Sequence, residues 1–238
     1  MNYKIIGEDE RFNILETLLQ KHGLRKAEPV DLIIAGPRDS IINYLENLSL
    51  NALVWGGKES KKELSKYNLM KLTPSDFYQR KNSIATAEGT LSIAITESKN
   101  IIHDLSVLIL GYGFLGKEVA ELFQNVGSKV IVCSKDDDEL SIANFNGIST
   151  INLSQLSYLK YPLIINTIPA KILTKDILNT TPEDCILIDL ASVSCLDEAD
   201  INRLKLIRAL GLPGIYSPSY AAKCIYEDLL PFIGKEST

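Results

Sequence analysis

The sequence is poor in the residues that build metal and redox sites. It has four cysteines and two histidines among 238 residues, and no two cysteines have the CxxC spacing of zinc ligands. Cys133 and Cys185 lie inside apolar runs typical of buried strands, where a reduced thiol is the ordinary state. We therefore expect no metal site.

An excess of basic residues is also absent. The chain has 25 Lys and Arg against 30 Asp and Glu, a formal net charge of −5, which argues against nucleic-acid binding. No apolar run approaches the ~20 residues of a membrane helix, and residues 1–7 (MNYKIIG) indicate a strand rather than a signal peptide. We expect a cytoplasmic protein that binds neither nucleic acid nor membrane.

The composition that remains is globular, with 45% hydrophobic and 23% charged residues. At roughly 150 residues per domain the length corresponds to about 1.6 domains. Short β-rich runs alternate with helical ones, which predicts βαβ units and parallel sheets. The predicted fold class is α/β, a doubly wound parallel sheet (a Rossmann domain) that binds NAD(P), with a second, smaller α/β domain at the N-terminus.

The strand-like and helical runs suggest four segments. Strands are expected in the first domain at 3–7, 31–35, 52–55 and 69–72, and in the second at 106–110, 129–133, 150–153, 163–168, 185–190 and 206–210. Helices are expected at 10–21, 40–48, 83–96, 115–125, 138–144 and 219–232. The segments are an N-terminal domain (1–82), a connector helix (83–102), the Rossmann domain (103–217) and a final helix (218–238) that packs back on the first domain.

A glycine-rich loop carries the most specific local signal. Gly111-Tyr112-Gly113-Phe114-Leu115-Gly116 fits the pattern G-x-G-x-x-G, directly after a buried strand and at the start of an amphipathic helix. Gly111 permits the tight turn, Gly113 lets the backbone approach a pyrophosphate, and Gly116 allows close packing of helix on strand. The N–H groups of the helix N-terminus then face the phosphates.

The residues after the second strand of this domain bear on the choice of cofactor. NAD enzymes usually place an acid there for the ribose 2′-OH. Here Ser134 and Lys135 follow, a hydroxyl and a cation that suit a 2′-phosphate. This favours NADP, with NAD as the second choice through Asp136 if the turn is longer; the acidic run at 136–138 otherwise suits the start of a helix.

Several motifs together resemble one family, the dipicolinate synthase A subunits. They are residues 82–89 (NSIATAEG), 108–113 (LILGYG), 166–170 (NTIPA), 188–192 (IDLAS) and 211–214 (GLPG) with Pro218, and more weakly 7–11 (GEDER). The resemblance implies NADP-dependent oxidation of dihydrodipicolinate, or of its hydroxylated tetrahydro precursor, to dipicolinate. It also implies that the partner is a flavoprotein-like B subunit, and that the chain works in the mother-cell cytoplasm of a sporulating bacterium.

The chain departs from that family at two places. After Ser192 the family has a Pro-Gly-Gly-type turn, whereas residues 193–197 read VSCLD. After Gly214 the family continues Lys-Val-Ala-Pro-Lys-Thr-Ala-Gly, whereas residues 215–222 read IYSPSYAA. Two lysines and a glycine are thus replaced, which leaves two alternatives open: a catalytically degenerate NAD(P)-binding subunit that supports a partner, or another small-acid dehydrogenase.

Ligands of open α/β sheets bind at the carboxyl ends of the strands. On the cofactor side we expect the residues that follow two strands, namely Thr167, Ile168, Pro169, Ala191 and Ser192. Thr167 and Ser192 are also candidate catalytic residues. Ser192 could donate a hydrogen bond to the carboxamide of the nicotinamide or to the substrate. Ordinary loop capping is the alternative for both.

A small dicarboxylate substrate requires cations or free N–H groups. Arg11 and Arg38 follow expected strand ends of the first domain, so both are candidates for an interdomain cleft, although each could equally be a surface arginine. Ser83 and Thr86 are further substrate-binding candidates from the motif at residues 82–89. Glu88 is the candidate acid–base residue, or else the partner of a nearby cation. The sequence leaves the oligomeric state open, a homo-oligomer included.

Overall fold

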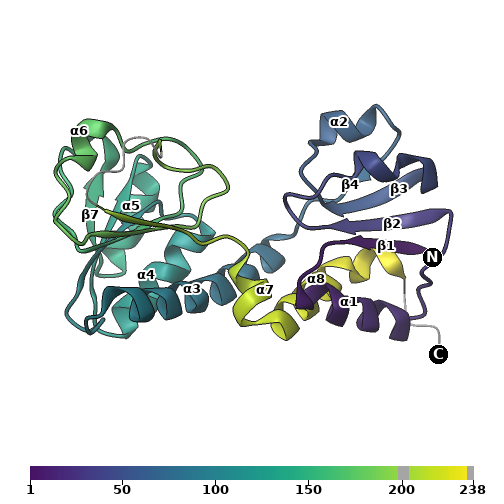
Figure 1. Cartoon of the computed structure of the whole chain (residues 1–238), viewed down its shortest axis with the longest axis horizontal. Coiled ribbons are helices and arrows are strands. Elements are labelled where there is room, and N and C mark those ends of the chain that lie inside the picture. Colours follow the sequence, from purple (N-terminus) through teal and green to yellow (C-terminus); the bar gives the residue numbers. More distant parts are fainter. Residues whose placement is uncertain (198–203, 235–238) are drawn as a thin grey trace. The chain divides into compact units, whose positions relative to one another are not determined.

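The computed structural model describes residues 1–197 and 204–234, which form two compact units (Figure 1). The first unit comprises Met1–Asn82 and the chain from Pro213 onward, and the second comprises Ser83–Leu212. The boundary at residue 82 falls inside the 23-residue helix α3 (Asp76–Ser98). Both units contain parallel sheets with helices packed on them, so the predicted α/β fold class is confirmed.

The first unit is built on a four-stranded parallel sheet. Its strands have the order β1-β2-β3-β4, with bounds β1 (Tyr3–Ile6), β2 (Val30–Ala35), β3 (Leu48–Gly56) and β4 (Met70–Lys71). Helices α1 (Glu10–Lys21) and α8 (Pro218–Ile233) pack together on one face of this sheet, and the 3₁₀ helix η1 (Ile42–Asn47) and α2 (Lys61–Ser65) lie against the other (Figure 1). The chain end after the second unit therefore completes the core of the first.

The apolar side chains of β2 point alternately to the two faces of the sheet, which explains why helices cover both faces. Leu32 and Ile34 pack with the α1 and α8 residues, whereas Ile33 and Ala35 pack with the residues of the opposite face. Successive side chains of a strand point to opposite faces, so an uninterrupted apolar strand requires a layer on each side. The only tryptophan, Trp55 of β3, belongs to the α8 face, where its indole N–H donates to the buried carboxylate of Asp228 at 2.8 Å.

The second unit is a doubly wound domain with a six-stranded parallel sheet. Its elements are β5 (Ser106–Leu110), α4 (Phe114–Asn125), β6 (Lys129–Ser134), α5 (Asp137–Phe145), β7 (Ser149–Asn152), the 3₁₀ helix η2 (Leu153–Gln155), β8 (Leu163–Asn166), α6 (Lys175–Leu178), β9 (Ile186–Asp189) and β10 (Lys205–Arg208). The strand order is β10-β9-β8-β5-β6-β7, so the direction of winding reverses between β5 and β8. Ligands of such sheets bind outside the carboxyl ends of the strands at this switch point.

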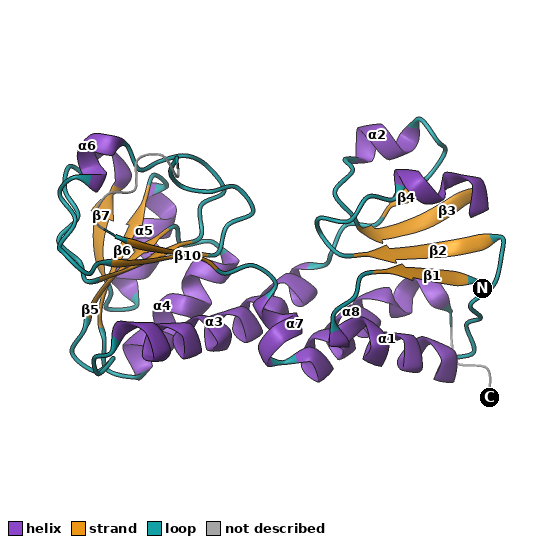
Figure 2. Ribbon diagram, viewed as in Figure 1, coloured by secondary structure: helices purple, strands orange, loops and turns teal. Residues whose placement is uncertain are grey.

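Helices cover the two faces of this sheet unequally. Helices α3 and α4 lie on one face of the sheet (Figure 2). Ala87 and Ala94 of α3 and Val119 and Phe123 of α4 pack into one apolar cluster with the residues of β5 that share their face. The small alanines let α3 lie close to the sheet. The opposite face is covered mainly by loop residues and the four-residue helix α6. The short helix α7 (Leu212–Tyr216) links this unit to α8.

Three expected elements differ in the structure. The helix expected at 40–48 is the 3₁₀ helix η1, and β3 already begins at Leu48; β-branched isoleucines and two asparagines are poor helix formers. The connector helix begins at Asp76 instead of residue 83, because the Ser75 hydroxyl accepts the Tyr78 N–H at 3.1 Å and caps it. The last helix ends at Ile233, and residues 235–238 of the expected final segment lie outside the described residues.

His22 contacts the last helix of the first unit through both ring nitrogens. It follows α1, yet it is buried, with Nδ1 2.8 Å from the Tyr226 hydroxyl and Nε2 3.0 Å from the carbonyl oxygen of Gly234. The imidazole thereby joins α1 to α8. In the part of the chain that the structure describes, no helix has the length and apolar character needed to cross a membrane.

All four cysteines are buried and unbonded to one another. Burial raises the pKa of the Cys133 thiol to about 11 and those of Cys185 and Cys195 to about 12. The pKa of Cys224 is also raised by burial. Because the thiolate is the reactive form, these thiols are inert in the folded protein.

We expect the folded chain to resist thiol reagents. At pH 8.5 the native protein should consume less than about one equivalent of Ellman's reagent in the time that a free thiol reacts fully. In denaturant, all four thiols should react. Rapid labelling of the native protein would contradict the buried, protonated state of these side chains.

Candidate functional site

The glycine loop between β5 and α4 has the geometry of a phosphate-binding turn. Gly111 has a φ of +94°, and a Cβ atom there would lie 2.5 Å from Oγ1 of Thr167. A Cβ at Gly116 would lie far inside van der Waals contact with the carbonyl oxygen of Gly111. A Cβ at Gly113 would have only an oxygen of Glu139 nearby, at 3.9 Å. Two glycines therefore close the turn, and the third leaves open space above it.

Helix α4 begins at Phe114 without a side-chain cap. Gly113 is its N-cap residue, so the first N–H groups have no side-chain acceptor there. Phe114 is exposed and Leu115 half-buried, whereas Tyr112 is buried beneath the loop. A helix N-terminus with free N–H groups beside a glycine that leaves space fits the pyrophosphate of a dinucleotide.

Thr167 follows β8 on the other side of the switch point. Its hydroxyl donates to the carbonyl oxygen of Leu110 at 2.8 Å, and its backbone N–H reaches the same oxygen at 2.9 Å. Thr167 thus ties the loop after β8 to the end of β5, as the capping alternative expects. Ile168 is half-buried and Pro169 is exposed. These residues flank the glycine loop, since the Gly111 turn contacts both Thr167 and Ile168.

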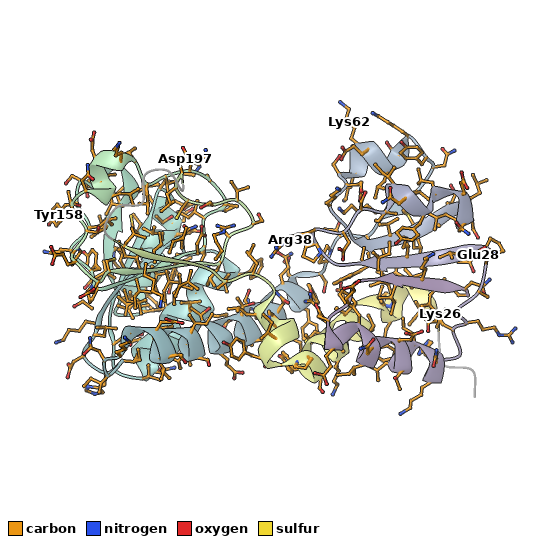
Figure 3. The ribbon with its side chains drawn as sticks, viewed as in Figure 1. Lys26, Glu28, Arg38, Lys62, Tyr158 and Asp197 are labelled. Atoms are coloured by element: carbon orange, nitrogen blue, oxygen red, sulfur yellow. The ribbon has the colours of Figure 1, made fainter. Side chains whose placement is uncertain are left out.

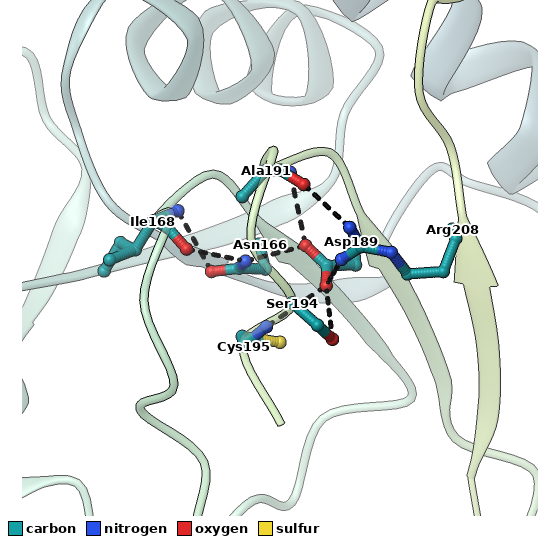
Figure 4. A network of polar contacts seen from close by, with 7 residues as sticks. All are labelled: Asn166, Ile168, Asp189, Ala191, Ser194, Cys195 and Arg208. Carbon is teal, nitrogen blue, oxygen red and sulfur yellow. Dashed lines mark hydrogen bonds and ion pairs between the residues drawn. The ribbon is translucent and has the colours of Figure 1, made fainter. Parts of the chain in front are cut away.

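A buried carboxylate joins the ends of β8 and β10 to the loop that follows β9 (Figure 4). Asp189 ends β9 and is 0% exposed. Its Oδ1 accepts from the Asn166 side-chain amide at 2.8 Å, and its Oδ2 forms an ion pair with Arg208. The oxygens also accept from the Ser194 hydroxyl and from the backbone N–H groups of Ala191 and Cys195, at 3.1 to 3.2 Å.

Asn166 and Arg208 extend this network to the neighbouring loops. The Asn166 amide donates to the carbonyl oxygen of Ile168 at 3.0 Å and accepts the Ile168 N–H at 3.1 Å. Arg208 donates its second Nη to the Ala191 carbonyl oxygen at 3.0 Å. The backbone at Ile168 and Ala191 is therefore fixed by side chains, which leaves Ser192 exposed on a held turn.

The end of β6 is arranged differently from the expected phosphate site. Ser134 is buried, and its hydroxyl donates to Oε2 of Glu139 at 2.6 Å. Asp136 caps α5, since its Oδ1 accepts the N–H groups of Asp138 and Glu139. Lys135 is exposed. Three residues, Ser134, Lys135 and Asp136, were expected to determine whether NADP or NAD binds. In the described part of the chain, only Lys135 among them has no assigned hydrogen bond.

In the first unit, Arg11 opens α1 just after the end of β1. Its side chain is buried, with one Nη 2.8 Å from Oδ2 of Asp9. Among the described residues, neither Nε of Arg11 nor Oδ1 of Asp9 has a hydrogen-bond partner. A Cβ at Gly214 of α7 would lie 2.9 Å from Oδ2 of Asp9, so only a glycine lets α7 approach this pair. A buried guanidinium with an unused donor is suited to an anion.

The other substrate candidates lie on separate elements. Arg38 is exposed on the loop after β2 (Figure 3). Ser83 and Thr86 are buried along α3, where each has an interaction partner, and Glu88 of the same helix is exposed. Within residues 1–197 and 204–234, no three His, Cys, Asp or Glu side chains gather into a group that could hold a metal ion.

Sequence reasoning missed Glu139, Asn166 and Arg208. For Glu139 a local signal existed, because Asp136-x-x-Glu139 after a strand is the pattern of a capped helix start, which assigns Asp136 to the cap. Asn166 and Arg208 carry no such signal. Their role follows only from the strand order, which places β8, β9 and β10 side by side.

Comparisons with known proteins confirm the resemblance carried by the motifs. No family model matches the chain. The dipicolinate synthase A subunit of Bacillus subtilis (strain 168) is 29% identical over 219 residues, which are 90% of this chain and 68% of that protein. The crystal structure of the dipicolinate synthase A subunit from Bacillus halodurans superposes with a TM-score of 0.83 and 26% identity, covering 98% of each chain.

More distant structures share the fold alone. The apo structure of D-lactate dehydrogenase from Escherichia coli has a TM-score of 0.66 at 9% identity and covers 96% of this chain and 95% of its own. A transhydrogenase from Sinorhizobium meliloti has a TM-score of 0.68 at 11% identity, with 97% and 91% covered. These two proteins therefore share the two-unit α/β fold with this chain.

We expect the Asp189→Asn substitution to destabilise the protein by about 3–5 kcal/mol, because it leaves Arg208 without its buried counter-charge. Urea denaturation followed by circular dichroism measures this loss. The matched control is Asp197→Asn, whose ion pair with Lys171 is exposed on both sides and should cost less than about 1 kcal/mol. Equal effects of the two substitutions would contradict the organising role of Asp189.

Proposed function

We propose that this chain, a homologue of the dipicolinate synthase A subunit, is an oxidoreductase that forms dipicolinate from a dihydrodipicolinate-type ring, with a nicotinamide dinucleotide as hydride acceptor. The observation that carries this proposal is the glycine loop at the switch point of β5 and β8. It is supported by the similarity to that protein over 90% of this chain. The hydroxylated tetrahydro precursor is the second form that the substrate could take.

The second unit supplies the cofactor site in this proposal. When bound, the dinucleotide supplies the nicotinamide ring that accepts a hydride. Gly113 and the first turn of α4 would hold the pyrophosphate through backbone N–H groups, whereas the Gly111 N–H donates to the carbonyl oxygen of Cys133 at 2.8 Å and Gly111 supplies the turn. The held turns at Thr167–Pro169 and at Ala191–Ser192 would hold the nicotinamide end of the dinucleotide. Ser192, exposed on the second of these turns, donates a hydrogen bond to the carboxamide or to the substrate.

The first unit supplies the cations for a small dicarboxylate. Arg38 is exposed and able to reach a carboxylate, and in the described part of the chain the buried Nε of Arg11 has no hydrogen-bond acceptor. Guanidinium groups suit bidentate binding of carboxylates. Ser83 and Thr86 serve this site as hydroxyl donors from α3, although their burial makes them the weaker members of the set.

Oxidation to the aromatic ring removes one hydride and one proton from the substrate. A bound nicotinamide would supply the hydride acceptor, and Glu88, exposed on α3, would take the proton in this proposal. Aromatisation favours the loss of hydride, so a strongly basic residue is not required. Thr167 acts by positioning the loop after β8, since its hydroxyl is bonded to Leu110.

The name of the relative describes one component of a larger enzyme, and we propose that this chain also works with a flavoprotein-like B subunit. We further propose that it acts in the cytoplasm of a sporulating cell. One observation favours a second candidate function, a catalytically degenerate subunit that binds NAD(P) and supports the partner. Residues 215–222 lack the two lysines that the family carries there.

The first test is turnover by the purified chain, alone and with the B subunit. Dihydrodipicolinate, generated in place from its precursor, should reduce the nicotinamide with a rise in absorbance at 340 nm. Dinucleotide binding without turnover in either setting would favour the degenerate subunit. Failure to bind any nicotinamide dinucleotide would refute the proposed oxidoreductase.

We expect Arg38→Ala to raise KM for the dicarboxylate about ten-fold or more with kcat little changed, because a charged hydrogen bond to a carboxylate is worth roughly 1.5–3 kcal/mol. Steady-state kinetics at saturating dinucleotide measures the split. Arg25→Ala is the matched control. Arg25 is exposed and pairs with Asn2 at the amino end of β1, the opposite end of the sheet from the carboxyl ends of the strands. An unchanged KM in Arg38→Ala would remove Arg38 from the substrate site.

A further inference from the structure

Glu139 joins the end of β6 to the glycine loop. It is the third residue of α5, and its Oε2 accepts two hydrogen bonds, from the Ser134 hydroxyl at 2.6 Å and from the Tyr112 backbone N–H at 3.2 Å. Tyr112 is the first variable residue of the glycine pattern, and Ser134 is the last residue of β6. A half-buried carboxylate therefore lies between the two elements that frame the adenosine end of a dinucleotide site.

The second oxygen of this carboxylate remains available for a ligand. In the described part of the chain, hydrogen bonds reach Oε2 but not Oε1. Oε1 lies 3.9 Å from the position that a Cβ would take at Gly113, the glycine that leaves space above the loop. Oε1 therefore borders the space in which the proposed function places the pyrophosphate and its ribose.

Two of the neighbouring acids, Asp136 and Asp137, each use one carboxylate oxygen for other hydrogen bonds. Asp136 uses Oδ1 to accept the N–H groups of Asp138 and Glu139, and Asp137 accepts from the Asn152 amide at 3.2 Å. The Ser134 hydroxyl cannot donate to a phosphate without giving up its 2.6 Å bond to Glu139. The residues predicted to bind a 2′-phosphate are thus reduced to the exposed Lys135.

The charge of Glu139 distinguishes the two nicotinamide dinucleotides. A carboxylate oxygen accepts a hydrogen bond from a ribose 2′-OH, the contact that acids make in folds that bind NAD. A 2′-phosphate brings close to two negative charges to the same place and has no proton to donate at neutral pH, so it is repelled. In this chain the acid comes from the helix after β6 instead of from the strand end.

We propose that Glu139 is the specificity-determining residue of the cofactor site, which binds the adenosine ribose hydroxyls and selects NAD(H) over NADP(H). This inference rests on the proposed function, because it assumes that the glycine loop holds a nicotinamide dinucleotide. It reverses the preference read from Ser134 and Lys135 in the sequence, and it assigns Ser134 the role of positioning the Glu139 carboxylate.

The test is direct binding of NADH and NADPH to the purified full chain, followed by the fluorescence of the reduced nicotinamide. We expect the unsubstituted protein to bind NADH about ten-fold or more tightly than NADPH. Glu139→Gln, which keeps the shape and can still accept from Ser134 and Tyr112, should narrow this ratio by about ten-fold, with NADPH binding improved. Asp138→Asn, one residue earlier and exposed, is the control and should leave the ratio within about two-fold.

The possible outcomes distinguish a failure of the Glu139 inference from a failure of the proposed function. Tighter binding of NADPH by the unsubstituted chain, or an unchanged ratio in a Glu139→Gln variant with native circular dichroism, would overturn the role of Glu139 and leave the oxidoreductase proposal intact. Binding of neither dinucleotide would refute the proposed function, and the role of Glu139 with it. A second variant, Ser134→Ala, should weaken NADH binding more than NADPH binding if Ser134 only positions the carboxylate.

Discussion

The Asp189 carboxylate is the interaction on which the edge of the second sheet depends. It is fully buried, and a buried charge is tolerated only where an opposite charge and hydrogen-bond donors compensate for the lost water. Arg208 supplies the charge, and Asn166, Ser194 and two backbone N–H groups supply the remaining bonds. One side chain thereby connects three parallel strands and the loop that follows β9.

The proposed cofactor site lies between the loop that follows β8 and the glycine loop that follows β5. The loop closes against Thr167, whose own position depends on the segment that Asn166 bonds. On the other side of the loop, Glu139 uses one carboxylate oxygen for structure and leaves the other facing open space. The two acids illustrate different uses of one chemical group, since Asp189 has all its bonding capacity filled from within the protein and Glu139 has not.

Local sequence patterns predicted the features that are formed by residues consecutive in the sequence. The buried runs of β5 and β6 and the spacing of Gly111, Gly113 and Gly116 locate the loop correctly, because strand, turn and helix are consecutive there. Contacts across the sheet were not predictable. Asn166 and Arg208 meet Asp189 only through the order β10-β9-β8, and Glu139 reaches the glycine loop only because β6 pairs with β5. The early start of α3 was missed because Ser75 caps it while also bonding Asp228 of α8.

The bond between Trp55 and Asp228 has a practical consequence. Since Trp55 is the only tryptophan of the chain and lies in the first unit, near-ultraviolet excitation at long wavelength addresses a single indole in that unit. Its emission reports the seating of α8 on the sheet, because the indole N–H is held by a residue of that helix. The second unit contributes no indole among its residues 83–212, so unfolding of the two units can be followed separately, one by tryptophan emission and both by circular dichroism.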